Sequence, residues 1–154
     1  MSCCVNPPCP HAVTMPILRP DVVLSTCFDE RFPASNVLDG LESTFYLTTG
    51  LFPQEILMNF SGDEVSVNRI QLVCHGVKAI KIERCTEHVP SAFEPVVDCE
   101  LASPPSGLQR EQFQVNKATV GNGVRFLKII IASGYEQFAA IHSIVVEGDG
   151  PSRA

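Results

Sequence analysis

The sequence predicts an all-β fold, an antiparallel β-sandwich, on three observations. Apolar residues between about 21 and 148 recur mostly at period two, which is the spacing of strands with one buried face. Valine, isoleucine and phenylalanine are frequent in these runs, and such residues favour strands. Glycine and proline fall between the runs at the spacing of turns in a sandwich. The length of 154 residues, with 45% hydrophobic and 18% charged residues, fits one folded domain.

The strand pattern is clearest in four segments. They are 69–74, 80–83, 113–115 and 124–131. The first three alternate between apolar and other residues, so each is expected to face a core on one side. The fourth changes parity between Phe126 and Leu127, which predicts either a β-bulge or burial on both faces. Only 34–41 and 136–140 look long enough for a helical turn.

The two ends of the chain differ in composition from this body. Residues 1–20 hold five prolines and three cysteines, which predicts an irregular, disordered leader because proline lacks the backbone donor of a ladder. Residues 149–154 are mostly turn-forming and small, which predicts a flexible tail. The predicted organisation is a leader over 1–20, a sandwich domain over 21–148 and a tail over 149–154.

Charge and composition argue against several classes of function. The 11 basic and 17 acidic residues give a net charge of −6, whereas binding to nucleic acid needs clustered Lys and Arg. No apolar run approaches the roughly 20 residues of a spanning helix, and the N-terminus lacks a secretory signal. The seven cysteines are therefore expected to be reduced thiols of a soluble, cytosolic protein. No phosphate-binding glycine loop is present, so nucleotide binding by this chain is not expected.

The cysteines of the leader leave alternatives open. Cys3, Cys4 and Cys9 with His11 could hold zinc, although no second pair of ligands follows at a suitable spacing. Acylation of Cys3 or Cys4 is a second alternative, and a single acyl chain anchors a protein only weakly. A reduced leader without a site is the simplest interpretation.

A thiol hydrolase would need a cysteine activated by a histidine. His75 adjoins Cys74 and His88 lies near Cys85, but adjacent strand residues point to opposite faces. Cys74 continues an apolar alternation and is expected in the core, while His142 is expected to have a structural role in or beside the last strand. No paired base is found, so the sequence predicts a protein that is not an enzyme.

Large apolar residues between 45 and 60 exceed what one face of a strand can bury. Two interpretations remain open, an exposed contact for a partner protein or buried turns. The residues are Leu47, Leu51, Phe52, Ile56, Leu57 and Met58.

The polar segment between 25 and 50 carries the most specific chemistry. It contains the turn Asn36-x-x-Asp39-Gly40, with Thr44 five residues after Asp39. Calcium takes six to eight oxygen ligands, and such a turn can aim a carboxylate, nearby carbonyls and a hydroxyl at one point. A plain Asx turn remains the alternative, because one carboxylate makes a poor cation site.

This segment resembles the opening of the galactose-binding-domain-like jelly rolls, which include the discoidin and coagulation-factor C-type modules. The likeness rests on Pro33, Asn36, Asp39, Gly40, 44–46 and 49–50. Tyr46 stands where those modules usually have tryptophan. One family within the group is closer still, the small jelly-roll subunits of the intraflagellar transport B complex of cilia. The runs that carry this second likeness are 48–55, 126–133 and 138–144, and the likeness covers about 21–148.

The resemblance implies an antiparallel jelly roll that performs no catalysis. It implies a heterodimer with a Rab-like small GTPase, intraflagellar transport protein 27, and contact with other subunits of complex B. The implied location is the cilium or flagellum and the cytoplasm near the basal body. The alternative within the same fold group is a carbohydrate- or lipid-binding discoidin-type module. The absence of tryptophan and of a secretory signal disfavours that alternative.

The resemblance also implies a structural calcium ion. The implied side-chain ligands are Asp39, Thr44 and Glu147, so the ion would join the first loop to the last strand. The implied carbonyl ligands are Asn36, Leu41, Thr44 and Val146.

Overall fold

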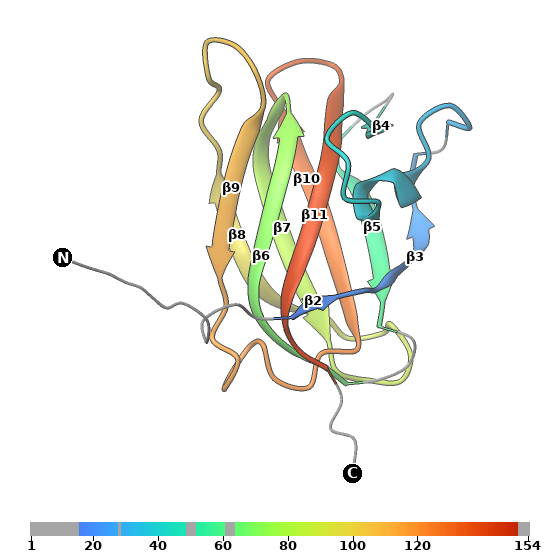
Figure 1. Cartoon of the computed structure of the whole chain (residues 1–154), viewed down its shortest axis with the longest axis vertical. Helices are drawn as coiled ribbons and strands as arrows, with labels where there is room; N and C mark the ends of the chain where they lie inside the picture. Colours follow the sequence, from blue (N-terminus) through green and yellow to red (C-terminus); the bar gives the residue numbers. More distant parts are fainter. Residues whose placement is uncertain (1–15, 28, 49–51, 61–63, 151–154) are drawn as a thin grey trace, which may run out of the picture.

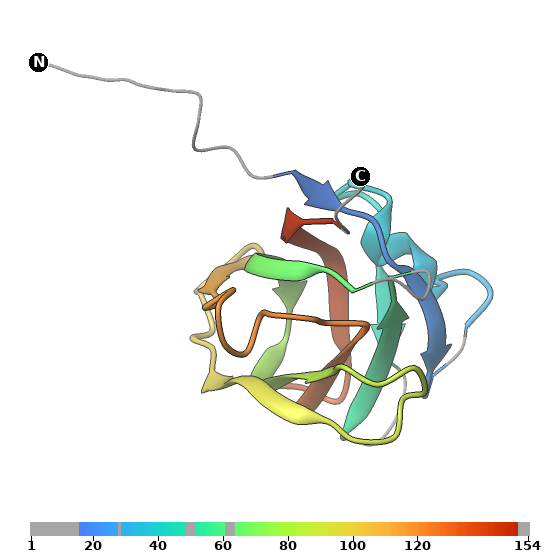
Figure 2. The ribbon, with the colours of Figure 1, turned by 90° about the horizontal axis from the view of Figure 1, so that it is seen from below.

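The computed structural model describes residues 16–27, 29–48, 52–60 and 64–150. Ten strands are present in these ranges, and the only helix there is the short 3-10 helix η1 (Ala34–Leu38). The strands form two antiparallel sheets that pack face to face (Figures 1 and 2). The predicted antiparallel β-sandwich is therefore confirmed. Within the described residues, no helix is long and apolar enough to cross a membrane.

The first sheet has the strand order β3-β5-β10-β7-β8. Its strands are β3 (Asp21–Ser25), β5 (Gln54–Asn59), β7 (Val77–Cys85), β8 (Glu94–Glu100) and β10 (Phe126–Gly134). The second sheet has the order β2-β11-β6-β9, and β4 also pairs with β11. Its strands are β2 (Ile17–Leu18), β4 (Tyr46–Thr48), β6 (Ser66–His75), β9 (Gln109–Gln114) and β11 (Ala139–Asp149).

The chain crosses from one sheet to the other between β2 and β3. Leu18 of β2 pairs with Val146 of β11, and Val22 of β3 pairs with Met58 of β5. The segment thus closes one side of the sandwich, as the blue ribbon in Figure 2 shows. Among the described residues, paired structure begins at Ile17, within the segment predicted as leader.

The core lies between the two sheets and follows the predicted alternation. Ile70, Leu72 and Cys74 of β6 are at most 2% exposed, and Ile80 and Ile82 of β7 are at most 1% exposed. Each strand presents every second side chain to the other sheet, so these residues share one apolar interior. Cys74 is a core residue, as predicted.

Strand β10 is buried on both faces where its sequence changes parity. Leu127 belongs to the core between the sheets, whereas Phe126 packs in a smaller cluster with Leu57, Cys85 and the partly buried Phe93. The register of β10 against β7 shifts only beyond Ile131. Burial on both faces, rather than a bulge, therefore explains the change of parity.

The apolar residues between 45 and 60 are largely buried. Ile56 and Met58 are in the core, Leu57 is in the smaller cluster and Phe52 packs partly buried against the core. These residues are therefore buried in the protein and do not form an exposed contact for a partner. Leu51 lies outside the described residues.

Of the two segments predicted as helical turns, one forms. Residues 34–38 become η1, within the predicted 34–41. The prediction for 136–140 is wrong, because Ala139 and Ala140 pair with β4 and belong to β11. Alanine favours helix in isolation, but pairing and burial between two strands override a propensity of less than about 1 kcal/mol.

Gln109 joins β9 to β7 through its buried side chain. Its Oε1 accepts the N–H of Val77 at 3.0 Å, and its Nε2 donates to the carbonyl of Val77 at 2.7 Å. The same nitrogen donates to the carbonyl of Ala102 at 2.9 Å. The amide thereby satisfies backbone groups at the start of β7, next to the turn at Gly76.

Candidate functional site

The loop between η1 and β4 is organised by Asp39. Its Oδ1 accepts the N–H of Leu41 at 2.8 Å, and its Oδ2 accepts the hydroxyl of Thr44 at 2.5 Å. The Thr44 hydroxyl oxygen also lies 3.4 Å from the Leu41 carbonyl oxygen. Gly40 has a φ of 79°, which glycine adopts without a steric penalty. The structure therefore brings together a carboxylate, a hydroxyl and a carbonyl of the predicted calcium site.

Asn36 links the two ends of this loop. Its carbonyl accepts the N–H of Asp39 at 3.3 Å, and its side-chain Nδ2 donates to the carbonyl of Phe45 at 3.0 Å. These bonds fix the turn geometry that the spacing of Asn36 and Asp39 indicated. The loop also forms the Asx turn that was the alternative to a cation site.

Glu147 is engaged elsewhere. It is 8% exposed, and its Oε1 accepts Arg69 Nε at 2.7 Å while its Oε2 accepts Gln71 Nε2 at 2.8 Å. Arg69 Nη2 lies 2.5 Å from the same Oε1. Both carboxylate oxygens are thus bound by β6, in a charge-assisted arrangement. Val146, whose carbonyl was implied as a ligand, pairs with Leu18 of β2 and Ile70 of β6 within the sheet.

The predicted calcium ligands therefore separate into two groups. Asp39, Thr44 and the Leu41 carbonyl converge in the loop, whereas Glu147 binds Arg69. In the part of the chain that the structure describes, no three or more His, Cys, Asp or Glu side chains cluster for a metal. A cation at the loop would rely on one carboxylate and on neutral oxygens.

His142 and two phenylalanines hold the loop against β11. The rings of Phe32 and Phe45 stack with centroids 4.8 Å apart, and the Phe45 ring lies 5.1 Å from that of His142. His142 Nδ1 lies 2.7 Å from the carbonyl oxygen of Glu42. Since a carbonyl only accepts, Nδ1 carries the proton of this bond. The structure gives His142 the structural role that was predicted.

An ion pair between Glu42 and Arg110 adds a second tie from the loop to β9. The guanidinium binds both oxygens of the carboxylate. Hydrogen bonding to Arg110 lowers the pKa of the Glu42 carboxyl below its ordinary value, and the same bond raises the pKa of Arg110. The pair is exposed, so its effect on stability is small.

The cysteine and histidine pairs suggested by the sequence do not form. Cys74 is fully buried and His75 is exposed, as opposite faces of β6 require. Burial raises the pKa of the Cys74 thiol to about 12, so the thiol stays protonated at neutral pH. The Cys85 thiol donates to the carbonyl of Val89 at 3.3 Å instead of reaching His88. The candidate zinc and acylation residues of the leader lie outside the described residues.

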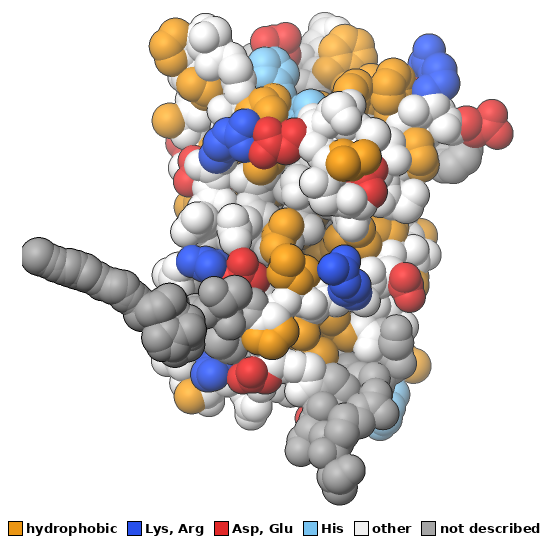
Figure 3. Space-filling model, in the orientation of Figure 1, with side chains coloured by type: hydrophobic (Ala, Val, Ile, Leu, Met, Phe, Trp, Pro, Cys, Tyr) orange, Lys and Arg blue, Asp and Glu red, His pale blue; other side chains and the backbone are white. Residues whose placement is uncertain are grey.

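Charged side chains on the second sheet alternate in sign. Figure 3 shows acidic and basic groups next to each other across this face. Three ion pairs contribute to it: Arg69 with Glu147, Arg110 with Glu42, and Lys117 with Asp149. Such a face is not the continuous basic surface that binds phosphates.

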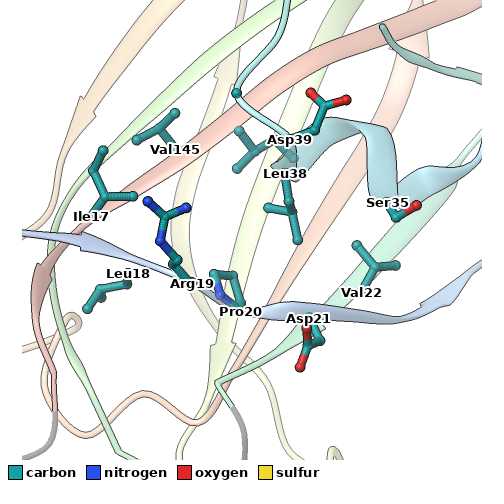
Figure 4. A pocket seen from close by; sticks show the side chains of 12 residues that line it. Ile17, Leu18, Arg19, Pro20, Asp21, Val22, Ser35, Leu38, Asp39 and Val145 are labelled. Atoms are coloured by element: carbon teal, nitrogen blue, oxygen red, sulfur yellow. The ribbon is translucent and has the colours of Figure 1, made fainter.

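A groove of about 550 Å³ lies beside the loop (Figure 4). Three parts of the chain form it: residues 17–22 of the β2 to β3 segment, η1 with the turn that follows, and residues 144 and 145 of β11. We call it the β2–η1 groove. Its residues are Ile17, Leu18, Arg19, Pro20, Asp21, Val22, Ser35, Leu38, Asp39, Gly40, Ile144 and Val145.

Three features of this region were not predicted from the sequence: the partners of Glu147, the ion pair between Glu42 and Arg110, and the groove. A charged residue in the apolar run 138–148 could have indicated a buried ion pair. Glu42 and Arg110 are 68 residues apart, so no local pattern predicts their contact. The groove combines 17–22, 35–40 and 144–145, and the last of these segments is far from the other two in sequence.

Comparison with known proteins settles the family. No protein-family model matches the chain. The chain is 37% identical over 127 residues to intraflagellar transport protein 25 of Chlamydomonas reinhardtii. The matched residues cover 82% of this chain and 64% of the algal protein. It is 34% identical over 128 residues to the human homolog of that protein, covering 83% of this chain and 85% of the human one. The chain belongs to the intraflagellar transport protein 25 family. It spans slightly less than two thirds of the algal relative's length.

Solved structures confirm the galactose-binding-like jelly roll. A family 32 carbohydrate-binding module of Clostridium perfringens NanJ, solved with galactose, has a TM-score of 0.68 at 15% identity, covering 84% of this chain and 96% of that one. Reduced XRCC1, solved with the DNA polymerase β catalytic domain, has a TM-score of 0.72 at 13% identity, covering 86% and 99%. At such identities the likeness concerns the fold alone. Membership of the intraflagellar transport protein 25 family supports a role in intraflagellar transport and a ciliary or flagellar location.

Proposed function

We propose that the chain is a non-enzymatic adaptor subunit of the intraflagellar transport B complex and forms a heterodimer with the Rab-like small GTPase intraflagellar transport protein 27. Membership of the intraflagellar transport protein 25 family carries this proposal. The two residues weighed as catalytic candidates have structural roles, since Cys74 is a core thiol and His142 holds a loop. The adaptor is proposed to act in the cilium or flagellum and in the cytoplasm near the basal body.

Co-expression tests the heterodimer. The full chain is expressed with the GTPase and passed through size-exclusion chromatography at micromolar concentration, with a secretory-pathway Rab as the matched control. One peak that contains the GTPase and the chain in equal amounts is expected, and the control Rab should elute separately. Two separate peaks for the proposed pair would contradict the proposal.

Calcium at the loop is part of the proposal. The Asp39 carboxylate, the Thr44 hydroxyl and the Leu41 carbonyl are oxygen donors of the kind that calcium prefers. The carbonyl of Asn36 lies in the same turn. These residues fit a structural ion held by the loop, while Glu147 would have to leave Arg69 to join it.

Thermal unfolding with calcium or with a chelator tests this site and its ligands. A calcium-saturated native state is expected to gain about 2.7 kcal/mol when calcium is present at 100 times its Kd. Asp39→Ala should remove that gain. Glu147→Gln should leave the gain intact if the loop alone holds the ion, and should remove it if Glu147 is a ligand. An equal melting temperature with calcium and chelator would refute the calcium proposal.

The alternative, a carbohydrate- or lipid-binding module, has only fold likeness in its favour, such as that to the galactose-bound module at 15% identity. A glycan array with the purified chain tests it directly.

A further inference from the structure

Strand β11 lacks a strand partner along part of one edge. One edge pairs with β6 over 140–149, and the other pairs with β4 over 139–141 and with β2 at 146 and 147. Among the residues that the structure describes, 142–145 have no strand neighbour on this second edge. The helix η1 packs against β11. The β2–η1 groove opens at this gap, because Ile144 and Val145 line it.

The walls of the groove are largely apolar and reachable. Leu18, Val22 and Leu38 are partly buried against the core, so they form a fixed lining. Ile17 at the rim is 51% exposed, and Leu41, next to the lining residue Gly40, is 53% exposed. The volume of about 550 Å³ falls within the range of ligand-binding clefts. The groove can therefore accept large apolar side chains.

Arg19 gives the groove a cationic centre. It is the one basic residue among the described residues of the lining, and its side chain is exposed. Figure 4 shows its guanidinium beside Ile17 and Val145, whereas the carboxylates of Asp21 and Asp39 point away from it. Both oxygens of Asp39 already accept hydrogen bonds within the loop. A guanidinium in this position favours a carboxylate, which it can bind with two parallel hydrogen bonds.

We propose that the β2–η1 groove binds an extended segment of a partner protein that carries large apolar side chains next to an Asp, a Glu or a terminal carboxylate. The missing strand neighbour beside 142–145 suits an extended backbone, and the apolar lining suits alternate side chains. Charge complementarity with Arg19 selects the acidic group. The exposed rim fits a polypeptide that enters and leaves the groove better than an acyl chain that must be enclosed. This inference rests on the proposed adaptor function and adds the surface on which it acts.

A peptide array tests the groove. Peptides of about 15 residues are tiled across the other complex B subunits and the GTPase, and captured tiles are titrated against the full chain by fluorescence anisotropy. Tiles with an acidic residue beside large apolar residues are expected to bind. Arg19→Glu should weaken them at least tenfold. The control Lys81→Glu makes the same change of charge at an exposed site on β7 and should bind as the wild type does.

A second variant in the lining keeps the test independent of charge. Val145→Gln places a polar side chain in the lining of the groove and should also weaken binding of the tiles at least tenfold, with circular dichroism confirming the fold. Binding to no tile, or equal binding by Arg19→Glu, overturns the proposal. So does binding to phosphatidylserine vesicles that depends on Arg19 when no tile binds.

The same variants separate this proposal from the proposed function. If the wild-type chain does not co-elute with the GTPase, the heterodimer fails, whatever the tiles show. If it co-elutes but no tile binds in a way that depends on Arg19, the heterodimer stands and the groove proposal alone is refuted.

Discussion

Two buried weak acids make the stability of this protein sensitive to alkaline pH. Tyr46 is fully buried, and its hydroxyl accepts the N–H of Cys27 at 3.2 Å. Burial raises the pKa of Tyr46 from 10.0 to about 12 and that of Cys74 from 9.0 to about 12. Each group is charged when deprotonated, so the fold holds the neutral form. Stability is therefore full below the unfolded pKa of each group and is lost as pH rises toward the folded pKa.

The size of the loss follows from the shifts. Each unit of pKa difference corresponds to about 1.4 kcal/mol. A pH of 11 lies about one unit above the pKa of Tyr46 in the unfolded chain and about two units above that of Cys74. The expected losses at that pH are about 1.4 and about 2.7 kcal/mol, together about 4 kcal/mol. Such a loss is a large part of the roughly 5–15 kcal/mol that stabilises a typical domain.

Urea unfolding followed by circular dichroism at pH 8, 9, 10 and 11, in a reducing buffer of constant ionic strength, measures this effect. Tyr46→Phe should be about 1 kcal/mol less stable at pH 8, because a hydrogen bond is lost. It should then lose less stability than the wild type between pH 10 and 11. Cys74→Ala should remove the larger part of the slope, which starts near pH 9.

Ile141→Val serves as the control. Ile141 pairs with Tyr46 across β4 and β11, and its shortening costs about 1 kcal/mol without removing an ionisable group. It should keep the full alkaline slope of the wild type. If Tyr46→Phe and Cys74→Ala lose stability as steeply as Ile141→Val does, burial of these two groups does not cause the pH dependence.

Two further predictions concern the second sheet. Gly148→Ala would place a Cβ 1.9 Å from the carbonyl oxygen of Ser66, so we expect urea unfolding to show a loss of about 3 kcal/mol in the free energy of unfolding. Gly150→Ala is the control and should change this free energy little, because a Cβ at Gly150 would meet open space. Glu147→Gln leaves the Arg69 guanidinium without its counter-charge and should lower the free energy of unfolding by about 2 kcal/mol. In a double-mutant cycle, adding Arg69→Met should recover part of that loss. A purely additive cycle would contradict the coupling of the two residues.

The fold was largely predictable because strands such as β6 and β7 contain clear alternation. The runs 69–74 and 80–83 each follow the pleat, so their buried faces could be assigned before their neighbours were known. Strand β2 could not be predicted in this way. It has two residues that lie between prolines, and it exists only because β11 offers an edge to pair with. A short strand of this kind has no periodicity of its own.

The candidate site was predictable where it is local. Asp39 and Thr44 are five residues apart, and the turn between them fixes their contact. The position of Glu147 depended instead on which strand lies beside β11 and in what register, and β6 places Arg69 opposite it. A sequence pattern within one strand contains no information on that neighbour. The groove depends on how β11 lies beside 17–22 and 35–40, and no local pattern predicts that arrangement.

The hydrogen bonds of the Gln109 amide restrict which residues can replace it at this position. One end of the group must attract a hydrogen and the other must supply hydrogens to the carbonyls of Val77 and Ala102. In a glutamate of the same shape, an oxygen that cannot donate would face the carbonyl oxygens of Val77 and Ala102 and repel them. A leucine or methionine would leave these two carbonyls and the N–H of Val77 without a hydrogen-bond partner. Homologues that replace this side chain are therefore expected to have rebuilt the start of β7 as well.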